Sequence, residues 1–317
     1  MLDNVLLKIS DLEVCLEKIP LINSLTLDIK FGEMFGLVGE SGSGKSLTAL
    51  SILRIQEPTM QISNGSIEFN GTNLLNLKIE ELQNIRGNEI SMIFQEPMTS
   101  LNPVFTVGQQ IREILLLHRV LSKKQAQCEV LHLLERVGIP LPEVVQYRYP
   151  HQLSGGQRQR IMIAIALACK PKLLIADEPT TALDVTIQRQ ILSLIDKLRK
   201  EEKMSVLLIT HDLGVVAEYC DRVGVIYGGK IVEVASAKDL FLSPKHQYTK
   251  ALIKAIPSNN NKGKKLSTID GVVPDPKNRP DGCCFHNRCS AAVDKCTQET
   301  PRMTKETHQF ACWNPAT

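Results

Sequence analysis

The stretch that decides the fold spans residues 39–46 and reads Gly39-Glu40-Ser41-Gly42-Ser43-Gly44-Lys45-Ser46. It matches the pattern of a phosphate-binding loop (P-loop), in which glycines let backbone N–H groups turn inward around phosphate oxygens. Lys45 supplies a full charge to the β- and γ-phosphates, and Ser46 offers a hydroxyl to Mg²⁺. The alternative is a glycine-rich turn with a solvated lysine, and the expected flanking strand and helix argue against it.

Strands and helices alternate around this loop. An apolar run from Met34 to Val38 precedes it, and a helix with Leu47, Leu50 and Leu53 on one face follows from Ser46. Further elements of the same alternation are expected at Ile90 to Phe94, Leu173 to Ala176 and Val206 to Thr210 (strands) and at Thr186 to Lys200 (helix). The pattern predicts an α/β fold with a largely parallel, helix-covered sheet.

Other segments depart from this alternation. The first 75 residues read as β-rich, whereas residues 97–168 show helical periodicity. Val223 to Tyr227 and Ile231 to Val234 predict a hairpin around two glycines. Residues 257–282 are rich in Asn, Lys, Pro and Gly, which is typical of a linker or an irregular arm.

Composition excludes several classes of protein. The chain has 317 residues, 43% hydrophobic and 22% charged, and its net charge is 37 − 34 = +3, too weak to indicate nucleic-acid binding. The longest apolar run, Ile161 to Cys169, is far short of the roughly 20 residues that cross a bilayer. The N-terminus lacks the pattern of a signal peptide. We therefore expect neither a secreted nor an integral membrane protein.

A second group of chemically suggestive residues ends the strand at Leu173 to Ala176. Asp177 follows it and is placed to hold Mg²⁺ through water, and Glu178 is placed to polarise an attacking water. Alone, the pair would more often be a charged turn. Beside a P-loop, the functional interpretation is favoured.

The most specific stretch is Leu153-Ser154-Gly155-Gly156-Gln157, the signature loop. Ser154 stands where a helix N-cap is expected, and the two glycines permit close backbone approach to an anion. Here the sequence resembles the ATP-binding cassette (ABC) family over residues from about 1 to 256. The resemblance implies a P-loop NTPase cassette with a mixed sheet core, an antiparallel β subdomain and an α-helical subdomain at about 97–168.

The resemblance also implies roles for residues that carry little information alone. Gln95 matches the Q-loop glutamine and would link Mg²⁺ and water to a membrane partner, and His211 matches the switch histidine that contacts the γ-phosphate and Glu178. Ala182-Leu183-Asp184 matches the D-loop. The expected catalytic set is thus Glu178, His211 and Gln95, with ATP as substrate and Mg²⁺ held by Ser46, Gln95 and Asp177.

One stretch departs from the family pattern. Residues 14–19, Val14-Cys15-Leu16-Glu17-Lys18-Ile19, contain no aromatic residue where the family usually stacks adenine. We therefore expect apolar rather than stacked contact with the base.

The chain has one P-loop and one signature loop, and a phosphoryl-transfer site needs donors around all the γ-phosphate oxygens. The family resemblance implies that the signature loop faces the nucleotide of an opposing subunit. Two chains should therefore sandwich two ATP molecules, and hydrolysis should release the closed dimer.

Residues 95–103, 107–111 and 244–249 resemble the ATPase subunits of oligopeptide and dipeptide importers. This resemblance implies a second homologous ATPase, two membrane permease subunits and an extracytoplasmic peptide-binding protein as partners, no nucleic acid, and a peripheral position on the cytoplasmic face of the cell (inner) membrane. The alternatives are an importer of nickel or a metal chelate, or a non-transport ABC ATPase acting on nucleic acid or ribosomes.

Five of the nine cysteines fall in the last 35 residues, which with the expected linker makes residues 257–317 a Cys-rich C-terminal extension. Cys283, Cys289, Cys296 and Cys312 continue the importer resemblance, and some members of that group carry a [4Fe–4S] cluster there. Four thiolates suit such a cluster or tetrahedral Zn²⁺, and the absence of paired CxxC knuckles favours the cluster, with unligated thiols as a third option. Four other cysteines are expected to be small core residues: Cys15, Cys128, Cys169 and Cys220.

Overall fold

The computed structural model describes residues 4–95, 100–181, 183–256 and 268–316. Two compact units emerge: Met1–Leu75 with Ile209–Thr317, and Asn76–Leu208. The extension thus belongs to the same unit as the N-terminal strands. A functional boundary at residue 256 stays a prediction.

The first unit contains a four-stranded antiparallel sheet in the order β2-β1-β4-β5. Its strands are β1 (Val5–Leu16), β2 (Ile19–Lys30), β4 (Met60–Phe69) and β5 (Thr72–Asn73). Leu16 pairs with Ile19 where β1 turns into β2, and apolar side chains such as Ile9 and Ile29 are fully buried. The β-rich start of the chain is confirmed.

A second set of paired strands in this unit has the order β11-β10-β9-β3. They are β3 (Met34–Val38), β9 (Arg222–Tyr227), β10 (Lys230–Ser236) and β11 (Gln309–Phe310). β3 runs parallel to β9, whereas β9 and β10 form the predicted hairpin, with Tyr227 opposite Lys230. Gly228 and Gly229 make the turn at φ 53° and 78°, values that favour glycine.

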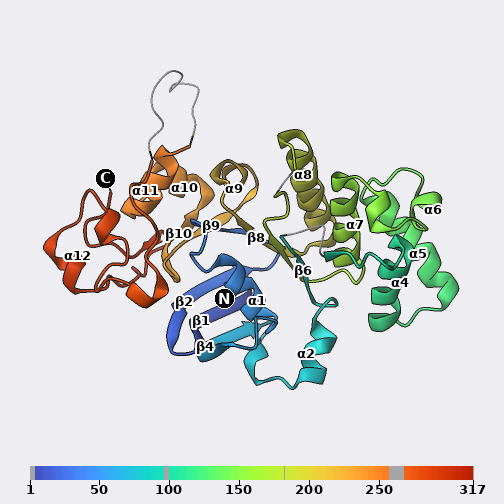
Figure 1. The fold of residues 1–317 in the computed structure, drawn as a ribbon, viewed down its shortest axis with the longest axis horizontal. Helices are drawn as coiled ribbons and strands as arrows, with labels where there is room; N and C mark the ends of the chain where they lie inside the picture. The colour runs from blue at the N-terminus through green and yellow to red at the C-terminus, as the bar shows by residue number, and fades with distance from the viewer. Residues whose placement is uncertain (1–3, 96–99, 182, 257–267, 317) are drawn as a thin grey trace. The chain divides into compact units, whose positions relative to one another are not determined.

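The helices of the first unit are short. They are α1 (Lys45–Ile52), α9 (Leu213–Tyr219), α10 (Ala237–Leu242), α11 (Gln247–Lys254) and α12 (Asp294–Gln298). The extension joins this unit through strand β11, whose Phe310 pairs with Glu233 of β10 (Figure 1). The buried ring of Phe285 adds a second contact, with centroids 5.2 Å from those of Tyr227 and of Tyr248.

The second unit holds β6 (Ile90–Ile93), β7 (Leu173–Asp177) and most of β8 (Ser205–Thr210), in the order β8-β7-β6. The last two residues of β8 belong to the first unit. β6 and β7 are parallel, with Ile93 opposite Ala176. Its helices are α2 (Ile79–Ile85), α4 (Val107–His118), α5 (Lys123–Arg136), α6 (Pro142–Val145), α7 (Gly155–Leu167) and α8 (Val185–Glu202).

Helices α4 to α7 lie together, drawn in green in Figure 1, and bury Ile111, Leu134 and Ile161. The expected helical stretch is thereby confirmed, although its first residues, 97–99, lie outside the described ones. Every helix in the described parts of the chain is too short or too polar to cross a bilayer. Cys15 and Cys220 are buried as expected, but Cys128 is exposed on α5, so that expectation was wrong.

Candidate functional site

The P-loop of the first unit connects a buried strand to a helix. All five residues of β3 are buried, and α1 begins at Lys45. The Lys45 side chain folds back over the loop, where its Nζ donates to the carbonyl oxygens of Gly39 and Glu40 at 2.9 Å each. Lys45 is only 6% exposed, so its charge is fixed inside the loop.

The glycines of this loop are required by packing at Gly39 and by backbone conformation at Gly42 and Gly44. A Cβ at Gly39 would collide with the carbonyl oxygen of Ile226 and would lie 2.9 Å from the Ser43 hydroxyl. Gly42 and Gly44 have φ of 75° and 105°, which L side chains rarely adopt. Gly44 is also the N-cap of α1 and provides no side-chain cap. A helix start of this kind favours an anion such as a phosphate.

The remaining loop residues differ in exposure. Ser41 is exposed and Ser46 half-buried. The hydroxyl of Ser43 is buried without a hydrogen-bond partner among the described residues, while the Ser43 backbone accepts from the Gly229 amide at 3.0 Å. The β9–β10 turn therefore fixes the back of the loop.

The acidic strand end lies in the second unit, at the carboxyl ends of two parallel strands. Because Ile93 of β6 stands opposite Ala176 of β7, residues two positions further on meet. The Gln95 amide donates to Glu178 Oε2 at 3.1 Å, and the Thr181 hydroxyl donates to the same oxygen at 2.9 Å. The structure thus brings together Gln95 and Glu178, which the sequence placed 83 positions apart.

Backbone geometry distinguishes the two acids. Asp177 ends β7 and is 4% exposed. Glu178 adopts φ 43°, a left-handed conformation that costs a non-glycine residue about 1 kcal/mol or more. Such conformations gather at functional sites, where surrounding contacts hold them in place.

The signature loop begins α7. Ser154 is its N-cap: the hydroxyl accepts from the Gln157 amide at 3.3 Å, and the Gln157 side chain accepts from the Ser154 amide at 3.1 Å. The predicted cap is therefore confirmed, and it is reciprocal. Leu153 is buried just before it, whereas Ser154 and Gly155 are exposed.

The two signature glycines have room for a side chain. A Cβ at Gly155 would lie 3.7 Å from Leu183, and one at Gly156 would lie 3.4 Å from Ile187. Both distances are those of ordinary van der Waals contact. The contacts also show that the start of α7 lies against the D-loop region, where Asp184 caps α8 by accepting from Ile187 N at 2.9 Å. Ala182 lies outside the described residues.

His211 follows β8 and belongs to the first unit, where it is exposed. The next residue, Asp212, caps α9 through Gly214 N at 2.8 Å. Residues 14–16 end β1, residues 17 and 18 make the turn, and Ile19 begins β2.

Comparison with known families agrees with these motifs. A family model described as "ABC transporter" matches residues 22–181. The chain belongs to the ABC transporter family. A second model, "Oligopeptide/dipeptide transporter, C-terminal region", matches residues 232–296 of the cassette chain.

Curated relatives extend the match. The chain is 52% identical to the oligopeptide transport ATP-binding protein AppD of Bacillus subtilis over 90% of this chain and 88% of that protein. It is 45% identical to the dipeptide transport ATP-binding protein DppD of Escherichia coli over 93% and 90% of the two chains. A solved dimeric ATP-binding cassette in a post-hydrolysis state with ADP and Pi is 28% identical, with a TM-score of 0.65, over 73% of this chain and 98% of that one.

The extension gathers four thiols in one part of the ABC protein. Cys283 N donates to the Cys296 carbonyl at 2.8 Å, and Gly282 has no room for a Cβ beside that carbonyl. Burial raises the pKa of the Cys283 thiol to about 11, and the charges of Cys296, Cys284 and Cys312 contribute to the rise. Burial likewise raises the pKa of Cys289 and of Cys312, each with a contribution from the Cys296 charge.

These thiols lie near enough to influence one another's ionisation. However, no three His, Cys, Asp or Glu side chains of the described residues, which include all five cysteines of the extension, are grouped to hold a metal ion. The structure gives the predicted cluster or zinc site no support beyond this proximity.

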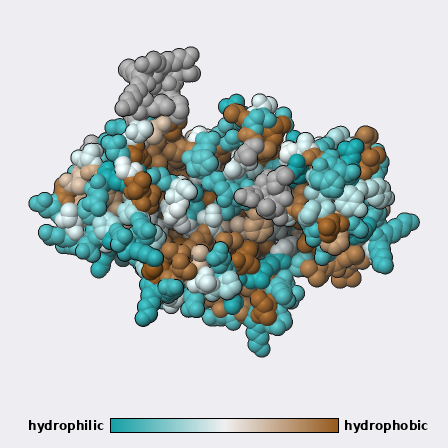
Figure 2. Space-filling view, viewed as in Figure 1, coloured by the Kyte–Doolittle hydropathy of each residue, from teal (hydrophilic) through white to brown (hydrophobic). Residues whose placement is uncertain are grey.

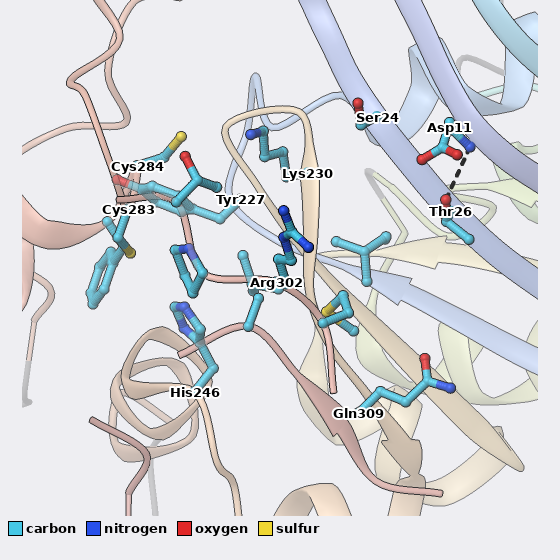
Figure 3. Close-up of a pocket in the computed structure, with 17 residues that line it drawn as sticks. Asp11, Ser24, Thr26, Tyr227, Lys230, His246, Cys283, Cys284, Arg302 and Gln309 are labelled. Carbon is cyan, nitrogen blue, oxygen red and sulfur yellow. Dashed lines mark hydrogen bonds between the residues drawn. The ribbon is translucent and has the colours of Figure 1, made fainter. Parts of the chain in front are cut away.

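A cavity of about 390 Å³ lies in the first unit between the extension and the strands (Figure 3). Cys283 and Cys284 line it on one side, Lys230 and His246 on others, and Arg302 extends into it from the extension. None of the P-loop residues lines this cavity.

Two residues beside the P-loop were missed as site residues from sequence. The Tyr248 hydroxyl accepts from the Glu40 amide at 2.9 Å, and Arg288 pairs with the Glu40 carboxylate. They are separated from Glu40 by 208 and 248 positions. Tyr248 stands in a stretch that resembles peptide importers, but nothing in one sequence pairs either residue with the loop.

Proposed function

We propose that this chain is the ATP-hydrolysing subunit of an importer of oligopeptides or dipeptides. The observation that carries the proposal is the presence, in one chain, of an ABC cassette and of the C-terminal region that characterises oligopeptide and dipeptide transporters. The similar proteins of Bacillus subtilis and Escherichia coli carry oligopeptide or dipeptide transport in their names.

The residues divide the reaction between them. The loop Gly39 to Ser46 binds the triphosphate, with Lys45 as the fixed charge. Glu178, oriented by Gln95 and Thr181 through their bonds to one carboxylate oxygen, polarises the attacking water. Gln95 and Thr181 both donate to Oε2, and the carboxylate would accept the proton of the attacking water. His211 contributes a polar contact to the γ-phosphate.

Magnesium would be held by the Ser46 hydroxyl, the Gln95 side-chain oxygen and Asp177. These are oxygen donors, which Mg²⁺ prefers. The bound ion would neutralise charge on the transferring phosphoryl group. Asp177 is buried at the end of β7, so its carboxylate is held in a fixed position for that role.

The signature loop Leu153 to Gln157 serves the nucleotide of a partner cassette, a homologous ATPase subunit. The room at Gly155 and Gly156 supports this assignment, because no atom of the described residues stands where a side chain would go. Absence of a side chain matters only if something from outside approaches the backbone. Asp184, beside this loop, would lie at the same contact.

An exposed apolar patch supports a permease partner at the cytoplasmic face of the membrane. Val104, Phe105, Val144 and Tyr147 are 70%, 44%, 47% and 69% exposed. The Val107 and Gly108 amides donate hydrogen bonds to the carbonyls of Arg148 and Gln146, which joins the two segments that carry these four side chains. Figure 2 shows hydrophobic side chains on the surface of this helical part. A patch of this kind fits a membrane subunit, and an extracytoplasmic binding protein would deliver the peptide.

We also propose a [4Fe–4S] cluster on Cys283, Cys289, Cys296 and Cys312, with Zn²⁺ as the alternative. The support is the four-thiol donor set and the match of residues 232–296 to the C-terminal region of oligopeptide and dipeptide transporters, although the described side chains are not grouped as metal ligands. Metal and sulfide analysis of protein purified without oxygen tests it. Iron with equimolar sulfide supports the cluster, zinc supports the alternative, and neither metal contradicts both.

The function is tested with Glu178→Gln in the transporter assembled with its permease. The variant should bind ATP with unchanged affinity but hydrolyse it at least about 100-fold more slowly, because the amide cannot accept the proton of water. Peptide uptake into vesicles should stop with hydrolysis. Hydrolysis at the normal rate would remove Glu178 from its role.

The substrate class needs its own measurement. Vesicles carrying the wild-type transporter and its binding protein should accumulate a radiolabelled dipeptide or oligopeptide on addition of ATP, and Lys45→Ala vesicles should not. Accumulation of nickel instead of peptide would contradict the peptide proposal while leaving the ATPase intact.

A further inference from the structure

The P-loop residue Glu40 is gripped by a side chain of the C-terminal extension. Arg288 Nη1 donates to Glu40 Oε1 and Nη2 donates to Glu40 Oε2, each at 3.0 Å. This is a bidentate pair, the strongest form of an arginine–carboxylate contact. The Arg288 side chain is 5% exposed and that of Glu40 is 29% exposed, so water screens the pair only in part.

The Arg288 side chain is itself held in place by several hydrogen bonds. Its Nε donates to the Asp270 carbonyl at 2.9 Å, Nη1 also reaches the Tyr227 hydroxyl at 3.3 Å, and Nη2 reaches the Ile269 and Gly271 carbonyls at 3.3 Å. All five N–H groups of the guanidinium are therefore directed to acceptors. The guanidinium also lies 5.8 Å from the centre of the Tyr227 ring. The extension thus presents a rigid fork to the loop.

The backbone of Glu40 is fixed at the same time. Its amide donates to the Tyr248 hydroxyl at 2.9 Å, and its carbonyl accepts from Lys45 Nζ and, at 3.2 Å, from the Ser43 amide. Tyr248 is fully buried and packs against Phe285 of the extension. Glu40 is therefore the point where the phosphate-binding lysine, the loop backbone and the extension meet.

The charge of Glu40 makes this grip necessary. A carboxylate within a loop that receives a triphosphate repels the ligand, because like charges a few ångströms apart disfavour each other. Arg288 balances the charge of the carboxylate and keeps the Glu40 side chain from moving towards the phosphates. The loop can then offer its N–H groups and Lys45 without an opposing charge.

We propose that Arg288 is a positioning residue for ATP: it holds and neutralises Glu40, and thereby couples the fold of the extension to the affinity of the P-loop for nucleotide. The inference rests on the proposed binding of ATP at this loop. It assigns to the extension a direct role in nucleotide binding. Arg288 itself touches no reacting atom.

The test compares ATP affinity of the full chain, measured with a fluorescent ATP analogue, in wild type, Arg288→Gln, Glu40→Gln and the double variant. Arg288→Gln should weaken binding about tenfold, because it leaves an unpaired carboxylate in the loop. The double variant should recover to within about threefold of wild type, since it has no carboxylate to neutralise. A residue that merely stabilised the extension would show no such recovery.

Conservative and matched variants sharpen the result. Arg288→Lys keeps the charge but loses the fork, so an intermediate loss of about threefold is expected. Arg302→Gln makes the same substitution in the same extension at an exposed residue and should leave affinity unchanged. In ATPase assays of the assembled transporter, Arg288→Gln should raise KM and leave kcat nearly unchanged.

The wild-type protein provides a test that does not depend on a variant's folding. Coupling is reciprocal, so ATP should slow amide hydrogen exchange in residues 268–316 as well as in the P-loop. Protection of the P-loop alone, Arg288→Gln affinity within twofold of wild type, or a double variant as weak as Arg288→Gln would each overturn the inference. Lys45→Ala, measured in parallel, distinguishes failure of this inference from failure of the proposed function. If Lys45→Ala binds ATP normally, ATP binding at the P-loop is contradicted, and with it the proposed function.

Discussion

The chain contains two glycine-rich loops that begin helices, and they are built for opposite reasons. In the P-loop, the chain's own structure requires glycine: Gly39 has no space for a Cβ, and Gly44 adopts φ 105°. In the signature loop, the surrounding packing does not require glycine: Gly155 and Gly156 have space for a methyl group, and Ser154 already caps the helix. Glycine in the first loop is required by the fold, whereas glycine in the second is not required by the packing of the described residues.

This difference separates what one subunit completes from what it leaves for a partner. The P-loop is supported on its own side by the β9–β10 turn, Tyr248 and Arg288. Among the described residues, Ser154 and Gly155 at the start of α7 are exposed. A residue type that the described residues do not need for folding points to a requirement from outside them, which in the proposed function is the phosphate of an opposing nucleotide.

The largest effect should come from Gly155→Ala. The methyl group fits the chain, so the free energy of unfolding should stay unchanged or rise slightly, since alanine favours helix. ATP hydrolysis by the assembled transporter should fall on the order of 100-fold, because the methyl group blocks approach of the phosphate to the amides. Thermal unfolding and steady-state ATPase rates measure the two quantities.

Either of two results would break the comparison. If Gly155→Ala hydrolysed ATP normally, no phosphate approaches that backbone. If it unfolded more easily than wild type, the glycine would be needed by the chain itself, as in the P-loop.

Gly39→Ala should show the reverse pattern. The added methyl group meets the Ile226 carbonyl, which belongs to a paired strand and cannot move away easily. We expect a loss of about 2–3 kcal/mol in the free energy of unfolding. Denaturant unfolding of the isolated chain measures it, and Gly155→Ala is the matched control. A loss below about 0.5 kcal/mol would show that the P-loop adapts.

The sequence predicted the first loop more completely than its surroundings. Periodicity and turn residues sufficed for β3, α1, the β9–β10 hairpin and the Ser154 cap, because these depend on neighbours in the chain. The Gln95–Glu178 bond was not predicted, and it arises because two parallel strands end at one sheet edge. The Arg288–Glu40 pair could not be found this way, because a salt bridge across 248 positions leaves no local pattern. The expected metal grouping of the four cysteines also depended on distances that spacing does not supply.

The support beneath the P-loop should weaken in acid. Burial lowers the pKa of His246 to about 4, so the folded protein keeps it neutral while its Nδ1 accepts from the Tyr248 amide at 3.1 Å. The unfolded chain binds a proton near pH 6.5, so stability is full above that pH and falls as the pH drops towards 4. At pH 5 the loss should be about 2 kcal/mol.

His246→Asn tests this dependence. Asparagine keeps an acceptor for the α11 cap but does not titrate, so the difference in unfolding free energy between pH 7 and pH 5 should shrink by about 2 kcal/mol. Unfolding curves of both proteins at the two pH values provide the measurement. Equal pH dependence in the two proteins would show that His246 is not the group that takes up the proton.

The smallest effect distinguishes the cap from the phosphate contact within the signature loop. Ser154→Ala removes the hydroxyl that accepts from the Gln157 amide and should cost about 1 kcal/mol of stability. Ser154→Asp keeps a capping oxygen and should stay within about 0.5 kcal/mol of wild type. Its charge should nevertheless lower ATPase activity of the assembled transporter more than alanine does, because it repels the phosphate. If the aspartate variant were both stable and fully active, the start of α7 would be a capped helix with no anion beside it, and the contrast between the two loops would reduce to packing alone.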